Sequence, residues 1–391
     1  MTSLDRYFLT VLKAALRGES APPETLTDGQ WGNLLALAQS HRVLPLFCHS
    51  APIPHHLTAH KADLRRQVAV QAIRTEEFLP LYAALRQEGI TPLVVKGILC
   101  RRLYPQPDLR PSSDEDLLIP PDQWERTLAV MKAMGAEMTL KGHEICCHLP
   151  GQVLSIELHR DLIPPDVHAY GHWNSLFSDI FQRGEEIEEN GVSLLTPDPT
   201  DHLFYLICHA LKHFLHSGFG IRQVCDMALF AQTQPIDWDR LANNCRAIGA
   251  EQFSAAIFRI AQNYLGFDGE KARYPRQWQQ LAVDEIPLLE DLLQAGVYGT
   301  SSASRLHSSN MTLDAAGGEP RKGLLGSLFP PKARLLPQYG YLESRPWLLP
   351  LAWTQRLLGY AKQIRPSNSP RKAARIGKDR IRLLQQYGLI R

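Results

Sequence analysis

The sequence predicts an α+β protein in which a small mixed β-sheet is flanked by an amino-terminal and a carboxyl-terminal helical region. Two observations support this fold class. Apolar residues recur at helical spacing over residues 1–90 and again from Pro197 onward. Between them, short apolar runs rich in β-branched residues alternate with helical patterns bounded by proline and glycine. The central order is β, α, β, α, β, β, which indicates a small mixed sheet with helices on one face.

The chain of 391 residues is long enough for two or three domains. We place an amino-terminal helical region at residues 1–80 and the domain that contains the sheet at residues 81–197. A second helical domain follows at residues 198–300. Residues 301–391 combine a Pro-, Gly- and Ser-rich segment with a basic helical tail.

Three helices are predicted before the sheet. The first is "SLDRYFLTVLKAALRG", where Leu, Phe and Val lie at helical spacing. The second is "TDGQWGNLLALAQSHRVLPLFCHS", which starts near Asp28 and ends around Pro45. The third is the long "LTAHKADLRRQVAVQAIRTEEFLPLYAALRQEGI", which ends at Gly89.

The sheet-forming region starts with a buried strand, Leu93 to Val95, that ends at Lys96-Gly97. A short helix, "ILCRRLYPQP", is stopped by its prolines, and the strand "DEDLLIP" follows. The helix "PDQWERTLAVMKAMGAEM" comes next and ends near its glycine. Two more strands, "EICCHL" and "VLSIELHRDL", are joined by a hairpin turn at Pro150-Gly151.

After the sheet, the pattern is helical in "PTDHLFYLICHALKHFLH", "GIRQVCDMALFAQTQPIDWDRLANNCRAIG" and "EQFSAAIFRIAQNYLGF". Thr200 and Asp201 are suitable amino-terminal caps for the first of these helices. Residues 300–340 are rich in Ser, Gly and Pro and are predicted to be an extended or partly mobile segment. The last 50 residues are predicted to form one or two helices.

The bulk properties exclude several classes of protein. The formal net charge of +2 gives the whole chain no strong attraction to nucleic acid or to an anionic membrane. The seven cysteines show neither a CxxC motif nor metal-ligand spacing, so we expect reduced thiols in a cytoplasmic protein. No segment approaches the roughly 20 apolar residues of a membrane span, and we expect a soluble protein without a membrane partner. Residues 362–391 are strongly basic; this tail is a candidate contact for RNA or peptide, and equally a solvated helix face.

An acidic pair at the start of the second strand is the first candidate site. Side chains alternate along a strand, so Asp114 and Asp116 share one face while Glu115 points to the other. Two carboxylates on one face repel unless a cation lies between them, and Mg²⁺ prefers carboxylate and phosphate oxygens. By the same alternation, Glu157 and His159 share a face of the later strand. If the two strands are neighbours, Asp114, Asp116 and Glu157 form a three-carboxylate site that can hold two metal ions for phosphoryl-type transfer.

Lys96 and Gly97 lie where a strand turns into a helix. Glycine lets the backbone approach a ligand, and a lysine beside helix amide groups favours phosphate. Arg110, just before the acidic strand, supplies a second cation for a triphosphate. The alternative for Lys96 is a strand-end lysine that reaches solvent.

His209 and His213 lie four residues apart on one helical face. This spacing can bind zinc, but the sequence offers no clear fourth ligand. The histidines either face the cleft and contact a substrate, as His159 can also do, or pack against the sheet. Arg222 and Asp226 are likewise four residues apart, and the default interpretation is a simple helix-surface ion pair. A structural role that braces the catalytic domain is preferred to direct contact with the nucleotide.

The run "VVKGILCRRLYPQPDLRPSSDEDLLI" resembles the nucleotidyltransferase fold of the DNA polymerase beta-like superfamily, with a glycine-containing turn, an acid-x-acid strand and a later third acid. Together with "IELHRDL", "HALKH" and "RQVCDMALF", it is more closely similar to an uncharacterised nucleotidyltransferase family of bacterial genomes. The resemblance covers roughly residues 80–240.

The resemblance implies that Asp114 and Asp116 are metal ligands and that Glu157 is the third acid, which assists the attacking hydroxyl. Gly97 would lie in the nucleotide-binding turn. The superfamily usually has Gly-Ser at this turn, where the serine contacts phosphate. This chain has Lys96-Gly97 instead, so the phosphate contact there would come from the lysine charge.

Two hypotheses follow for the function. The first is a Mg²⁺-dependent enzyme that transfers a nucleoside monophosphate, such as AMP from ATP, from an NTP to an unidentified acceptor: a small molecule, a peptide or protein, or RNA. The second is a catalytically impaired nucleotide-binding or regulatory module with the same fold, which the missing serine at the turn supports.

Overall fold

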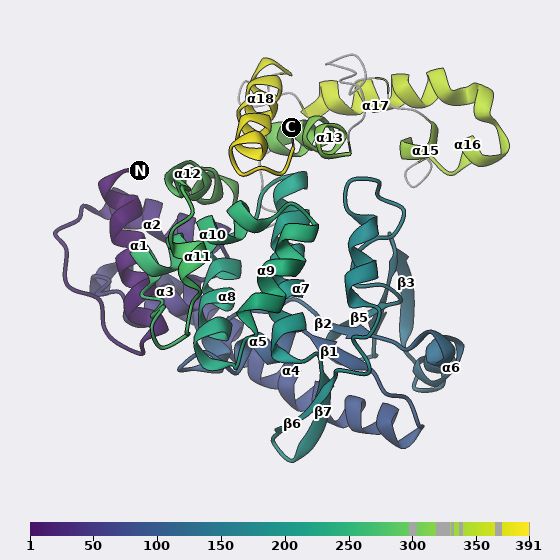
Figure 1. Ribbon diagram of the computed structural model, residues 1–391, viewed down its shortest axis with the longest axis horizontal. Helices are drawn as coiled ribbons and strands as arrows, with labels where there is room; N and C mark the ends of the chain where they lie inside the picture. The colour runs from purple at the N-terminus through teal and green to yellow at the C-terminus, as the bar shows by residue number, and fades with distance from the viewer. Residues whose placement is uncertain (297–302, 318–328, 330–331, 336–338, 364–369, 391) are drawn as a thin grey trace.

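The computed structural model describes residues 1–296, 303–317, 329, 332–335, 339–363 and 370–390. A five-stranded sheet lies on one side of the molecule, helices pack beside it, and the carboxyl-terminal helices lie above both in the view of Figure 1. The strand order is β1-β2-β5-β4-β3. The bounds are β1 Leu93–Val95, β2 Glu115–Leu118, β3 Glu137–Lys141, β4 Glu144–His148 and β5 Ser155–His159. Only the β2–β5 pair is parallel in this sheet, so the predicted small mixed sheet between helical regions is confirmed.

The amino-terminal helices are α1 Ser3–Leu16, α2 Asp28–Ser40, α3 Leu44–Ser50 and α4 Lys61–Gln87. Thr2 and Thr27 cap α1 and α2, each accepting a backbone N–H three residues ahead. The second predicted helix is in fact two, because the chain turns at Arg42, whose φ of 52° is left-handed. The long α4 ends before Gly89, as predicted; the positive φ of 70° there requires glycine.

Three strands were not predicted from the sequence. Strand β3 lacks the short apolar run from which strands were predicted, because all five of its residues are exposed. The separate hairpin of β6 Glu185–Glu189 and β7 Val192–Thr196 begins with an acidic run that does not look like a strand. Its turn residues Asn190 and Gly191 both have positive φ. An Asn-Gly pair is typical of a tight hairpin turn, so it was the sequence signal that could have predicted this hairpin.

The helices after the sheet are α7 Pro199–His216, α8 Ile221–Thr233, α9 Trp238–Ala247, α10 Glu251–Ile260 and α12 Ile286–Ala295. The cap of α7 is Asp198, which accepts the backbone N–H groups of Thr200 and Asp201. The prediction that Thr200 or Asp201 is the cap is therefore wrong, because Pro199 takes the first helical position and the cap lies before it, two residues before Thr200.

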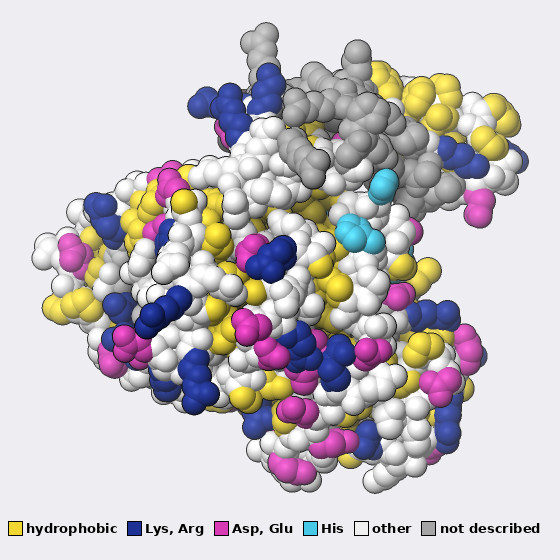
Figure 2. Space-filling view, viewed as in Figure 1, with side chains coloured by type: hydrophobic (Ala, Val, Ile, Leu, Met, Phe, Trp, Pro, Cys, Tyr) yellow, Lys and Arg dark blue, Asp and Glu magenta, His cyan; other side chains and the backbone are white. Residues whose placement is uncertain are grey.

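The prediction of an extended segment at residues 300–340 is wrong for α13, Ala303–Ala316, and for the short α15, Lys332–Leu335; residues 300–302, 318–328, 330–331 and 336–338 lie outside the described part. Helix α13 packs against α18, Pro370–Gln386, and both lie above α7. The described part of α18 turns Arg375, Lys378 and Arg382 outward and buries Arg380, and Figure 2 shows basic side chains gathered over it.

The two faces of the sheet have different surroundings. Leu117 and Leu158, register partners on β2 and β5, belong to the core formed with α4 and with α6, Trp124–Ala133. Residues of opposite parity on the same strands point away from this core, toward α7 and α8. Within the described ranges, none of the helices has the length and apolar character needed to cross a membrane.

Candidate functional site

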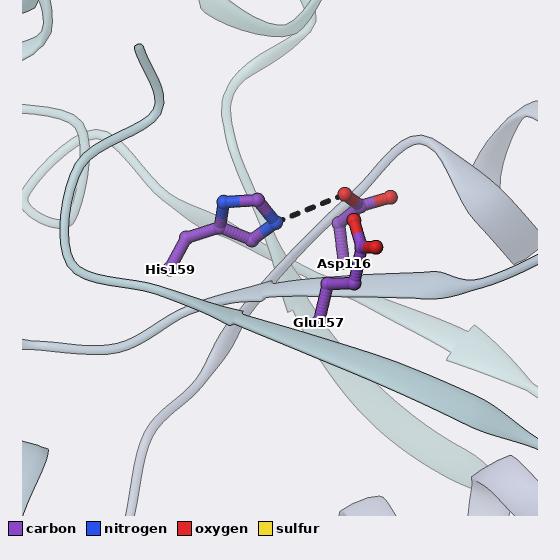
Figure 3. A group of neighbouring side chains, drawn as sticks. All are labelled: Asp116, Glu157 and His159. Carbon is purple, nitrogen blue, oxygen red and sulfur yellow. Dashed lines mark hydrogen bonds and ion pairs between the residues drawn. The ribbon is translucent and has the colours of Figure 1, made fainter. Parts of the chain in front are cut away.

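Asp116, Glu157 and His159 come together on the face of the sheet opposite the apolar core. Strand β5 lies beside β2 in parallel register, and Asp116 is directly opposite Glu157. The His159 Nε2 atom donates a hydrogen bond to Asp116 Oδ1 over 3.0 Å. Figure 3 shows the three side chains projecting from neighbouring strands toward one another. The condition set by the sequence, that the two strands be neighbours, is met.

These three residues are 1%, 8% and 5% exposed, in the order Asp116, Glu157, His159. One ligand atom from each lies within 4.8 Å of the others, and in the described residues this is the one group of that kind. Two carboxylates and an imidazole are a donor set that suits a divalent cation.

Asp114 lies just before β2 and is half-buried. It lines the same cavity as Asp116 and Glu157 but is outside the group of three ligand atoms. Its side chain accepts a hydrogen bond from Ser113, whose Oγ lies 3.4 Å from Asp114 Oδ2. A role for Asp114 as a metal ligand stays a prediction.

Lys96 takes the position of a counter-ion to Asp116. Its Nζ lies 2.8 Å from Asp116 Oδ1. The backbone has φ 56° and ψ −129°, a conformation that a non-glycine residue rarely adopts and that is typical of functional sites. The Lys96 N–H donates to His202 Nε2 over 3.2 Å, and burial lowers the pKa of His202 to about 3, which keeps that ring a neutral acceptor. The strained turn is thus fixed from both its backbone and its side chain.

The pKa of the Asp116 carboxyl reflects this pairing. Burial alone raises it, but the charge of Lys96 and the hydrogen bond from His159 outweigh burial and hold the pKa below its usual value. Burial lowers the pKa of Lys96, and the charge of Asp116 more than reverses this, so that the pKa lies well above its usual value. Both groups are therefore charged at neutral pH.

Position 97 has to be glycine, because Glu115, on the other face of β2, leaves no room there for a side chain. Its φ is +36°, and a Cβ there would lie 1.8 Å from Glu115 Oε2. Glu115 is fully buried, accepts the Ile98 N–H over 2.7 Å, and pairs with Arg101 at 3.3 Å. Burial raises the pKa of Glu115. From the sequence, Glu115 was predicted to lie on the opposite face of the strand, and no role was predicted for it. In the structure, its contacts hold the turn that carries Lys96.

Arg110 makes a bidentate ion pair with Asp226. Its Nε and Nη2 atoms lie 2.8 and 2.7 Å from the two carboxylate oxygens. The default pairing of Arg222 with Asp226 is wrong: Arg222 donates instead to the carbonyl of Pro111. Arg110 lies on the cavity wall, but its charge is balanced by a buried carboxylate. Its role as a phosphate ligand stays a prediction.

A cavity of about 570 Å³ joins these residues, and that volume is in the range of small-molecule sites. His209 and His213 line it from α7, with Nε2 atoms 3.1 Å apart. Lys96 Nζ lies 3.3 Å from His209 Nε2. Burial and the neighbouring lysines lower the pKa of both rings well below the usual value. The histidines face the cleft rather than the sheet core, and contact with a substrate stays a prediction.

Other residues on the cavity wall were not singled out from the sequence. They include Arg42, Lys141, Tyr170, Tyr205, Lys212, His216 and Gln223. Tyr205, Lys212 and His216 lie on α7 and the others come from separate parts of the chain, so only folding places them around one volume. Lys212 is the one that the sequence could have indicated most easily, because it is a basic residue between His209 and His213 in the "HALKHF" segment.

The carboxyl-terminal end of α7 is held by two arginines from outside the sheet domain. Arg305 Nε donates to the Ser217 carbonyl over 2.7 Å, and Arg380 Nη1 donates to the His216 carbonyl over 2.8 Å. These contacts satisfy carbonyls that a helix end leaves free. Helices α13 and α18 therefore fix the position of the wall that carries His209 and His213.

Comparison with protein families gives one match. Residues 27–266 fit the model of a family described as "Uncharacterised nucleotidyltransferase". The matched range contains the whole sheet, the turn at Lys96-Gly97 and the α7 wall. Neither the curated proteins nor the solved structures gave a significant match.

Proposed function

The chain belongs to the uncharacterised nucleotidyltransferase family, and from this premise we propose that it transfers a nucleoside monophosphate from an NTP to an acceptor with the help of Mg²⁺. The observation that carries the proposal is the direct opposition of Asp116 and Glu157 on neighbouring parallel strands, at a cavity that also contains cationic side chains. The acceptor is a small molecule, a peptide or protein, or RNA.

The residues at this position suit a divalent cation. Asp116 and Glu157 are buried, and two buried carboxylates this close raise each other's energy unless positive charge compensates them. Lys96 and Lys141 now supply that charge, at 2.8 and 3.4 Å respectively. We propose that Asp116 and Glu157 hold the ion, with Asp114 as a third carboxylate. His159, which donates to Asp116, orients this ligand.

When bound, the ion would stabilise negative charge on the transferred phosphoryl group and on the pyrophosphate leaving group. The protein groups have separate tasks. Glu157 accepts the proton of the attacking acceptor hydroxyl, directly or through water. A bond forms between the acceptor oxygen and the α-phosphorus, and the bond from the α-phosphorus to the bridging oxygen of pyrophosphate breaks. The strained turn keeps Lys96 beside Asp116 and prevents that carboxylate from rotating away.

The test is label transfer. The protein is incubated with each α-labelled NTP, Mg²⁺ and cell extract or candidate peptides, and labelled products are separated. We expect Asp116→Asn and Asp114→Asn to abolish transfer. Asp122→Asn, which removes an exposed carboxylate outside the cavity, is the matched control and should retain it. Transfer that survives Asp116→Asn would refute the proposed site.

One observation favours the alternative, an impaired nucleotide-binding or regulatory module. The turn has Lys96-Gly97 where the superfamily usually has Gly-Ser, and Lys96 forms an ion pair with Asp116, so a metal ion has to compete with an ammonium group for this carboxylate. NTP binding without transfer to any acceptor in the same assay would support the module. The exposed basic residues of α18 are the proposed contact if the acceptor is RNA, and strongly salt-dependent RNA binding would support that contact.

A further inference from the structure

The cationic side chains of the cavity fall into two groups. Lys96, Lys141 and Arg110 are each paired with a carboxylate, namely Asp116, Glu157 and Asp226. Their charge is already balanced within the protein. A second group, Lys212, Arg222 and Arg42, lines the same cavity without such a partner among the described residues.

Lys212 projects from α7 and is half-buried. It makes neither an ion pair nor a side-chain hydrogen bond with any residue that the structure describes. Burial and the nearby charge of Lys96 lower the pKa of its ammonium group. Burying a cation without a partner is costly, so an anion that entered the cavity would be bound strongly at this position.

Arg222 projects from the first turn of α8 and is in a similar position. One of its terminal nitrogens donates to the Pro111 carbonyl, and its buried Nε has no hydrogen-bond partner in the described structure. Burial and the charge of Arg110 lower its pKa to about 10, so the guanidinium is still charged at neutral pH. The Pro111 carbonyl is neutral, and the nearby Asp226, whose charge raises the pKa of Arg222, is already ion-paired with Arg110.

His209 and His213 line the cavity together with these cations. Lys96, Lys212 and Arg222 line the same cavity, and their charges lower the pKa of both rings. Because the pKa of both rings lies well below the usual value, the rings are neutral and do not add repulsion among the cations. His209 also contacts Gln223, through Nδ1 at 3.2 Å. The α7–α8 wall is therefore rich in donors and positive charge, while the opposite wall holds the carboxylates.

We propose that Lys212 and Arg222, together with His209 and His213 on the same cavity wall, form a binding site for the polyphosphate tail of the nucleotide. This inference rests on the proposed function and adds to it the residues that receive the β- and γ-phosphates. It moves that task from the Lys96–Gly97 turn to the α7–α8 wall, because Lys96 is already occupied by Asp116. Pyrophosphate, the leaving group, would remain on this wall after transfer. Arg42, from the turn before α3, adds charge at the edge of the same site.

The test uses inorganic tripolyphosphate, which has the charged tail and lacks a base and sugar. Binding is measured by calorimetry and by the shift in melting temperature, with EDTA and separately with Mg²⁺. We expect Lys212→Met to weaken binding by about 10- to 100-fold, the value of one charge-assisted contact. Arg222→Met should have a similar effect, and Arg222→Lys should recover part of it. Lys132→Met removes an exposed lysine of α6 outside the cavity and should bind as the wild type does.

The results separate this inference from the proposed function. If the wild type binds tripolyphosphate in neither buffer, or if Lys212→Met binds it as tightly as the wild type, the phosphate site is wrong. If Arg222→Met folds poorly, the result for Lys212→Met tests the phosphate site by itself. The Lys212 side chain makes neither an ion pair nor a hydrogen bond with any described residue, so its replacement removes no such contact from the fold. Tripolyphosphate binding that depends on Lys212, combined with no label transfer, would keep the site and reject the transferase. Label transfer with an unchanged KM for NTP in Lys212→Met would keep the transferase and reject the site.

Discussion

Replacing Gly97 by alanine tests whether the turn that carries Lys96 is fixed by Glu115. The added Cβ would lie 1.8 Å from Glu115 Oε2 and 2.7 Å from its Cδ. An exposed glutamate would move aside at little cost. Glu115 is fully buried and holds the Ile98 N–H at 2.7 Å and Arg101 at 3.3 Å, so it has to give up those contacts to make room.

The expected cost is the sum of two effects. An alanine at a φ of +36° carries a strain of about 1–2 kcal/mol. Displacing Glu115 loses two hydrogen bonds to a charged group, each about 1.5–3 kcal/mol. Gly97→Ala should therefore lower the free energy of unfolding by about 4 kcal/mol or more. Urea titration followed by tryptophan fluorescence measures it.

Gly135→Ala is the matched control for this prediction. Gly135 also has a positive φ, of +82°, but a Cβ there meets no atom within 4 Å. It should show only the backbone strain, about 1–2 kcal/mol. If Gly97→Ala costs no more than Gly135→Ala, Glu115 does not fix the turn, and the link from the buried Glu115–Arg101 pair to the position of Lys96 is refuted.

Two further predictions concern the buried ion pairs. The pKa of Asp116 is held below its usual value, so its pairing with Lys96 stabilises the fold above about pH 4 and this contribution is lost as the pH falls further. Lys96→Met should therefore lower the free energy of unfolding most near pH 7 and less below about pH 4; urea titrations across this range check it, and a difference that does not vary with pH would contradict it. Arg110→Ala leaves the buried Asp226 unpaired and should cost about 3–5 kcal/mol, whereas Arg160→Ala, at an exposed ion pair, should cost less than about 1 kcal/mol. Equal melting temperatures for the two variants would refute the energetic role of the Arg110–Asp226 pair.

The sequence by itself was sufficient for features that depend on local geometry. The alternation of side chains along a strand put Asp116 on one face and Glu115 on the other, and put Glu157 and His159 together. The helical spacing on α7 placed His209 and His213 on one side, and both line the cavity. In each case, the relation between residues follows from the repeat of a single strand or helix, which is the same in any fold.

The tertiary structure decided which groups compensate one another. The local i, i+4 rule favoured Arg222 as the partner of Asp226, yet Arg110 holds that carboxylate, because a buried charge pairs with the cation that the packed chain brings into bidentate geometry. In the same way, Lys96 is paired with Asp116. Lys212 is left without a carboxylate among the described residues, although the sequence gives these two lysines no such difference. Charge acts through space and burial increases its effect, so the distribution of paired and unpaired cations around the cavity is a property of the folded chain.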